Sequence, residues 1–191
     1  VMLLTTFCAS LAAAPYGYSV NSDSVDFFDG LFRIDLETGE DIRIGTVPPV
    51  GLPRTDIEGL AFAPNGTLYG VDDESLKLFP IDTNTAAIIS TGDVSIFGLP
   101  SGGSNDFGMT FACDGNLYLT SKVAKSLYRL DLDGQANLVG SLDHDIIAIA
   151  AYGNPVKLYG LGIGVNEFEE TLNPNLYEID PETGATKPIR S

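Results

Sequence analysis

A nine-residue phrase occurs four times along the chain, and this repeat constrains the fold more than any other feature. The two most similar copies are "LFRIDLETG" at 31–39 and "LYEIDPETG" at 176–184, and looser copies are "LFPIDTNTA" at 78–86 and "LYRLDLDGQ" at 127–135. Consecutive copies begin about 47 to 49 residues apart, a period that is typical of repeat architectures.

Each copy alternates apolar and polar residues and then meets a turn, which predicts a β-hairpin. A second hairpin is predicted upstream of the later copies, in "GLAFAPNGTLYGV" (59–71) and "GMTFACDGNLYLT" (108–120), with Asn65-Gly66 and Asp114-Gly115 as two-residue turns. Such dipeptides adopt positive φ at little cost. A third version has Asn154-Pro155 at its turn. Two hairpins in tandem form a four-stranded antiparallel unit, the size of a propeller blade.

The chain is therefore predicted to be an all-β β-propeller, with about four blades visible over 15–55, 56–103, 104–144 and 145–191. The predicted axial strands are 60–63, 109–112 and 149–152, and the second strands are 16–21, 68–72, 117–121 and 158–162. The third strands are the repeated phrases, and the outer strands lie near 42–47, 87–91, 136–140 and 185–190. Four blades with three axial strands indicate an incomplete propeller or a fragment of a larger one. The alternative is that "LLTTFCAS" supplies the missing strand.

Residues 1–14, "VMLLTTFCASLAAA", carry no charge and run from apolar to small side chains. This pattern predicts a secretory signal peptide whose usual basic start is missing, and with it a secreted or periplasmic protein. The run is too short to span a membrane as a helix. Cleavage would remove Cys8 and leave Cys113 alone, so we expect no disulfide framework.

The formal net charge of −16 excludes two classes of partner. Nucleic acid and anionic membranes both require a basic surface that displaces counterions. The remaining partners are a protein or a small-molecule ligand.

Several stretches resemble exported bacterial β-propeller proteins of unknown function, similar to the quinoprotein-like and YVTN-repeat-like propellers. These stretches are "APYGYSVNSDS…LFRIDLETG", "DIEGLAFAPNGTLYGVDD", "NDFGMTFACDGNLYL" and "NLYEIDPETG". The resemblance implies the fold and export, and it carries no catalytic residues. Relatives of this kind continue into a further "GLAF"-type strand, which this sequence lacks.

Acidic and amide side chains precede the predicted axial strands, and we expect Glu58, Asn105, Asp106 and Asp145 to converge over the central channel. Their oxygens suit Ca²⁺, which takes six to eight hard ligands, and calcium-dependent lactonase-like propellers use a similar set. No other cofactor is expected. The acidic segment 162–175, as a link between second and third strands, is expected at the opposite end of the ring.

Other polar residues are interpreted structurally. The repeated Asp of the phrase is expected to accept hydrogen bonds from turn N–H groups. His144 is expected on an exposed loop. Cys113 is expected to be a small, buried side chain and not a reactive thiol.

Three functions stay open. The preferred hypothesis is an exported, non-enzymatic propeller domain that presents loops to a ligand or protein. The alternatives are a Ca²⁺-dependent lactonase-like hydrolase and a structural component of a cell surface or matrix.

Overall fold

A computed structural model of the chain describes residues 16–21, 29–47, 56–89, 93–100, 105–162 and 175–189. Every regular element in these ranges is a β-strand. Within the same ranges, no helix has the length and hydropathy to cross a membrane. The predicted signal peptide and most of the acidic segment 162–175 lie outside the described residues.

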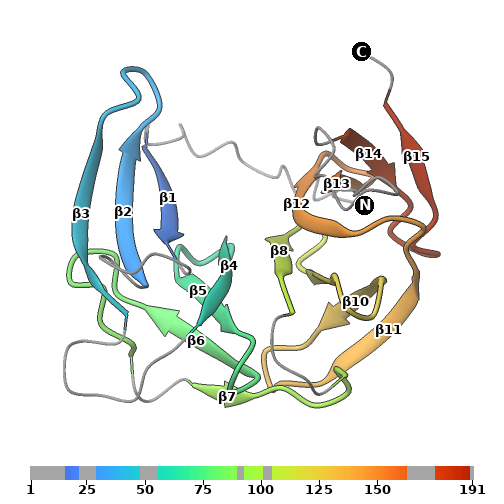
Figure 1. The fold of residues 1–191 in the computed structure, drawn as a ribbon, viewed down its shortest axis with the longest axis horizontal. Helices are drawn as coiled ribbons and strands as arrows, with labels where there is room; N and C mark the ends of the chain where they lie inside the picture. Colours follow the sequence, from blue (N-terminus) through green and yellow to red (C-terminus); the bar gives the residue numbers. More distant parts are fainter. Residues whose placement is uncertain are drawn as a thin grey trace, which may run out of the picture.

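The strands form four antiparallel sheets, which are the blades of a β-propeller (Figure 1). Blade 1 contains β1 (Tyr16–Asn21), β2 (Gly30–Asp35) and β3 (Asp41–Thr46). Blade 2 contains β4 (Ile57–Phe62), β5 (Leu68–Asp72), β6 (Lys77–Ile81) and β7 (Val94–Ser95). Blade 3 contains β8 (Phe107–Phe111), β9 (Leu117–Ser121), β10 (Ser126–Leu130) and β11 (Ala136–Ser141). Blade 4 contains β12 (Ile146–Tyr152), β13 (Lys157–Gly162), β14 (Asn175–Ile179) and β15 (Thr186–Pro188).

The predicted fold is confirmed, including the three axial strands, which are β4, β8 and β12. These strands contact one another, β4 with β8 and β8 with β12, and they lie nearest the centre in Figure 1. Gly66 and Gly115 have φ of 84° and 87° in the predicted hairpin turns, the left-handed values that favour glycine. Whether the chain is part of a larger propeller stays a prediction.

The outer strand of blade 2 differs from the prediction of 87–91 over its described part, 87–89; residues 90 and 91 lie outside the described residues. Ile88 makes only an isolated bridge with Ile81, and the strand itself is β7, at Val94–Ser95. Pro80 supplies the reason: its carbonyl accepts a hydrogen bond from the N–H of Ile89 at 2.8 Å, so its nitrogen faces the outer strand too. Proline has no N–H to return that bond, and the outer ladder is interrupted there.

Alternate residues of the repeated phrase pack into two different joints between blades. In the phrase of blade 3, Leu127 packs into the apolar cluster shared with blade 4, whereas Tyr128 and Leu130 pack into the cluster shared with blade 2. We call the side of a blade that meets the following blade its forward face, and the other side its backward face. Three apolar clusters fill the three joints between the four blades.

Glycines allow close backbone contact at the outer rim of these joints. A Cβ on Gly140 of β11 would overlap the carbonyl of Thr183, in the turn of blade 4. A Cβ on Gly45 of β3 would lie 2.9 Å from the carbonyl of Thr85, in the corresponding turn of blade 2. The outer strand of one blade therefore packs against the last hairpin turn of the next.

The repeated Asp has the structural role that was expected. Asp35 Oδ1 accepts bonds from the N–H groups of Glu37 and Thr38, at 2.8 and 3.1 Å. Asp180 Oδ1 accepts the equivalent pair from Glu182 and Thr183. These carboxylates stabilise turns at the rim and are not gathered around the axis.

The expectation for Cys113 is wrong. The side chain is exposed, because it occupies a hairpin turn at the surface of blade 3. It is also disulfide-bonded, so the expectation that Cys113 forms no disulfide is wrong as well. The sequence holds one other cysteine, Cys8, which lies outside the described residues.

Candidate binding site at the entry end of the axial strands

The links that enter the axial strands share one end of the propeller with the links between second and third strands. The N–H of Asn105, just before β8, donates to Asp73 Oδ2 at 2.9 Å, and Asp73 directly follows β5. The N–H of Ile57 donates to Asp29 Oδ1 at 3.1 Å in the same way between blades 1 and 2. The expectation that these links lie at opposite ends is therefore wrong, because alternate connections of an antiparallel sheet return to the same edge. We call this edge the entry end.

Asn105 is buried at the entry end and organises the link after β9. Its Oδ1 accepts from the hydroxyl of Ser121 at 2.9 Å and from the N–H of Val123 at 3.1 Å. Its Nδ2 has no hydrogen-bond partner among the described residues. A buried amide donor without an acceptor costs free energy, which the two bonds accepted by Oδ1 offset in part.

Lys122 lies among the carboxylates that the sequence predicted to converge. Its Nζ is 2.6 Å from Asp106 Oδ2. The pKa of Lys122 is raised, first by the hydrogen bond that its ammonium donates to Asp106, and then by the charges of Asp106, Asp145 and Glu58; partial burial opposes the rise. Of the four predicted site residues, Asp106 contacts the lysine ammonium, Glu58 and Asp145 act on it through their charges, and Asn105 adjoins Asp106 in sequence.

A second lysine pairs with the remaining predicted carboxylate. Lys125 Nζ is 2.8 Å from Asp145 Oδ1, at the start of β12. Since Asp145 also acts on Lys122 through its charge, two lysines and three carboxylates form one entry-end cluster, consisting of Glu58, Asp106, Lys122, Lys125 and Asp145.

Sequence reasoning missed both lysines of the entry-end cluster. They lie in "SKVAK", immediately after the second strand of blade 3. Once the links between second and third strands are placed at the entry end, the two lysines are the nearest cations to the acidic strand starts. The signal was therefore present in the spacing, and the wrong placement of these links hid it.

The structure offers an internal cation where a metal ion was predicted. Among the described residues, no group of three His, Cys, Asp or Glu side chains has a geometry that could hold a metal ion. The ligand set Glu58, Asn105, Asp106 and Asp145 converges only in part, around Lys122. Ca²⁺ binding stays a prediction to be measured.

His144 lies on an exposed link beside the entry end. Its ring stacks on Tyr177 of β14, with centroids 4.2 Å apart and planes inclined by 29°. This contact holds the imidazole against blade 4, in agreement with the expected surface role.

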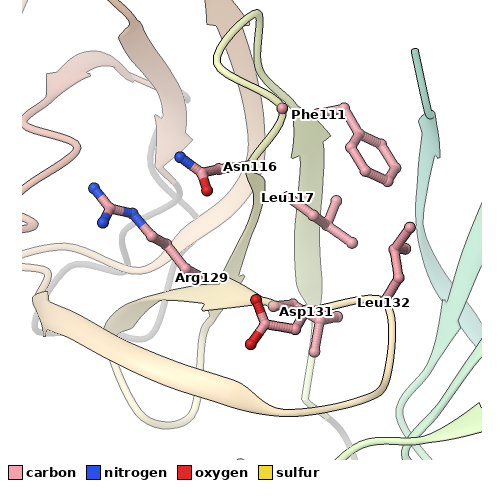
Figure 2. A pocket seen from close by; sticks show the side chains of 8 residues that line it. Phe111, Asn116, Leu117, Arg129, Asp131 and Leu132 are labelled. Atoms are coloured by element: carbon pink, nitrogen blue, oxygen red, sulfur yellow. The ribbon is translucent and has the colours of Figure 1, made fainter.

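The opposite end, where the hairpin turns lie, carries a small hollow on blade 3 (Figure 2). Its volume is about 100 Å³, whereas ligand pockets usually have about 300 Å³ or more. In Figure 2, Phe111, Leu117 and Leu132 lie on one side of the hollow and Asn116 and Arg129 on the other.

The guanidinium of Arg129 binds across the joint between blades 3 and 4 and does not serve this hollow. Its guanidinium donates to Glu182 Oε1 at 2.5 Å and to the carbonyl of Pro181 at 3.3 Å, both in blade 4. It also lies 5.7 Å from the ring centroid of Tyr118. Burial raises the pKa of the Tyr118 hydroxyl, and the hydrogen bonds with Tyr118 and Glu182 raise the pKa of Arg129. These groups stabilise the joint, so the entry-end cluster is the better candidate site.

Solved structures place the chain in one class, the β-propeller proteins. No protein-family model and no curated protein sequence matches the chain. It is similar to virginiamycin B lyase from Staphylococcus aureus, with 15% identity over 91% of this chain and 54% of that chain, and a TM-score of 0.55. It is also similar to a protein of unknown function from Bacteroides thetaiotaomicron, with 15% identity over 87% of this chain and 42% of that one, and a TM-score of 0.56.

A third similar structure comes from a nidogen/laminin complex, with 14% identity over 90% of this chain and 59% of that one, and a TM-score of 0.54. The chain thus spans about half the length of the structures that it matches. At these identities the similarity establishes the fold alone, and for the fold it confirms the resemblance found in the sequence.

Proposed function

We propose that the chain is a binding module, in which the propeller holds the entry end rigid and presents its links to a protein or ligand. The observation that carries this proposal is the entry-end cluster itself, in which Lys122 neutralises Asp106 at 2.6 Å. A carboxylate paired in this way is a poor general base and a poor metal ligand. Lys122 and Asp106 nevertheless keep more than a third of their side-chain surface exposed, so they remain accessible to a partner.

Two further features favour recognition over catalysis. The second ion pair of the entry-end cluster, Lys125 with Asp145, is also partly exposed, so the cluster presents both signs of charge to a ligand. Loops on a rigid scaffold commonly perform binding. One solved structure of the same fold belongs to a nidogen/laminin complex, which supports protein recognition as a use of such a scaffold, although fold does not determine function.

Export is part of the same proposal. The disulfide bond of Cys113 supports it, because disulfides persist mainly in oxidising compartments. The uncharged, apolar start of the sequence is a separate support, as a signal peptide, since removal of that segment would remove Cys8 as well.

The proposal is tested by panning a displayed peptide library against the immobilised protein. We expect enriched peptides whose binding is lost in the double variant Asp106→Lys/Asp145→Lys and retained in Asp131→Lys, which changes charge at the opposite end. Lactone and ester substrates should be hydrolysed no faster than in buffer. Ca²⁺-dependent turnover that disappears in Glu58→Ala would overturn the binding proposal in favour of the hydrolase, and enrichment that both variants retain would remove the entry end as its site.

A further inference from the structure

The first leucine of the repeated phrase reports which blades have a following blade. Leu31, Leu78 and Leu127 are each 0% exposed on the forward faces of blades 1 to 3. The fourth member, Leu176 of blade 4, is 45% exposed. One position of one repeat is thus fully covered three times and open once.

The rest of the forward face of blade 4 is open and apolar as well. By strand pairing, Leu161 occupies the place of Val71 and Thr120, and Tyr152 occupies the place of Ala112. Leu161 is 37% and Tyr152 74% exposed, whereas their counterparts Val71, Thr120 and Ala112 are buried. Ala148 and Ala150 extend the same exposed surface along β12. We call Ala148, Ala150, Tyr152, Leu161 and Leu176 the forward patch.

Blade 1 has a matching uncovered surface on its backward face. Phe32 and Ile34 are only half-buried, whereas the equivalent aromatic and aliphatic residues of the other three blades are buried. Together with Ser19 and Gly39, they line an open hollow of about 380 Å³. A Cβ on Gly39 would have no atom within 4 Å, while the equivalent Gly184 lies against Gly140 of the preceding blade. We call Gly17, Ser19, Phe32, Ile34 and Gly39 the backward patch.

The sizes of the residues in the two patches are complementary. In the joint between blades 3 and 4, the small Ala112 and the large Leu158 belong to one apolar cluster. At the equivalent positions, the forward patch has the large Tyr152 and the backward patch has Gly17, which is covered by the flexible, exposed side chain of Leu36. A large residue opposite a small one fills a joint as well as the reverse arrangement, since total volume is what packing conserves.

We propose that the forward patch of one copy binds the backward patch of a second copy, so that two copies close one ring with two identical joints. Each joint continues the pattern of the three joints inside the chain: leucine from the forward face, aromatic and aliphatic residues from the backward face. The matched part of this chain covers 54% of the lyase with the same fold, so two such matched parts together make up about one complete propeller. A head-to-tail contact that closes after two copies is a cyclic dimer.

The test combines molar mass with mixing of variants. Light scattering at about 50 µM should give a molar mass twice the 20.3 kDa of one chain. We expect a stable dimer at this concentration because two joints together bury a large apolar surface. Leu161→Glu breaks the forward patch and Ile34→Glu the backward patch, and each variant alone should be monomeric because both joints contain the damaged patch. Mixing the two variants should restore a dimer, because one joint then pairs two intact patches.

Matched controls keep the result interpretable. Leu138→Glu alters another exposed leucine, on β11, and should leave the wild-type mass unchanged. Circular dichroism of each variant checks that the exposed substitutions leave the blades folded. Because each copy has a net charge of −16, added salt should strengthen the dimer by screening repulsion.

Three outcomes would overturn the proposal. The first is a folded wild-type monomer at this concentration, which would also indicate that something other than a second copy covers the patches. The second is a dimer that neither patch variant disrupts, and the third is a series of larger assemblies instead of a closed pair. None of these outcomes bears on peptide binding at the entry end, so the proposed function is tested separately.

Discussion

Lys122 Nζ lies 2.6 Å from Asp106 Oδ2, at the point where the axial strand of blade 3 begins. This ion pair places a protein cation beside the carboxylates that a channel metal would use. Several properties of the molecule should follow from it and from the joints between the blades.

Calcium should have little effect on the stability of the protein. A ligand at 100 times its dissociation constant stabilises a two-state fold by about 2.7 kcal/mol, which would shift the melting temperature visibly. Because Lys122 and Lys125 already pair with Asp106 and Asp145, we expect the melting curves with millimolar Ca²⁺ and with a chelator to coincide. An increase of several degrees that Glu58→Ala abolishes would instead establish the calcium site predicted from the sequence.

The ion pair of Lys122 should contribute stability that depends on pH. Its pKa is raised in the folded protein, so the folded state binds the proton more tightly than the unfolded chain. The contribution is complete below the unfolded pKa of about 10.4 and is lost as pH rises through the higher folded value. Lys122→Gln should thus have a lower free energy of unfolding than the wild type at pH 8. The expected difference is that of a half-exposed ion pair, about 0.5 kcal/mol, and it should appear as a lower melting temperature.

That difference should shrink above pH 10. The matched control is Lys187→Gln, which removes the same charge from an exposed site on β15. If the two variants respond identically to pH, the effect belongs to net charge and not to the pair with Asp106.

Gly140→Ala should weaken the joint between blades 3 and 4. The new methyl group would overlap the carbonyl of Thr183, and two backbones cannot separate as easily as flexible side chains. Overpacking of this kind costs about 1–3 kcal/mol, and a domain of this size loses about 2–4 °C of melting temperature per kcal/mol. Ser141→Ala, one residue further along β11, should melt within about 1 °C of the wild type, since surface substitutions have small effects. Equal melting of the two variants would contradict the close contact.

Cys113 should resist alkylation unless a reductant is present, because it is disulfide-bonded. Since Cys8 is the only other cysteine, a bond within the chain and the removal of residues 1–14 exclude each other. Intact mass before and after reduction, with sequencing of the mature N-terminus, distinguishes the two. A free thiol at Cys113 in a chain that starts after residue 14 would favour the signal peptide.

The fold could be predicted from the sequence because each repeat contains its own local signals. Asn65-Gly66 and Asp114-Gly115 define two hairpins without reference to the rest of the chain, and the alternation in each phrase defines the third strand. The outer strand of blade 2 was missed because Pro80 acts through a missing hydrogen bond to a neighbouring strand. A local pattern does not show which side of a strand that bond would be on.

The candidate site could be predicted only in part, for a similar reason. Glu58, Asp106 and Asp145 were found from their place before the axial strands. Their partners Lys122 and Lys125 belong to another type of link, and they reach the cluster only through the three-dimensional return of alternate connections to one edge. Lys122, which pairs with Asp106 in the predicted site, could therefore not be found from the strand starts alone.

The alternation within the repeated phrase also bears on how such a molecule can change its size. Where a phrase has a neighbouring blade on that side, it contributes a leucine to the joint ahead of it and an aromatic and an aliphatic residue to the joint behind it, as Leu127, Tyr128 and Leu130 do. Duplicating or excising one whole repeat would consequently bring matching halves together again, and no new interface would have to be invented. The number of units is then limited by geometry: the angle between successive units decides how many fit around a circle, while the residues at each junction can stay the same.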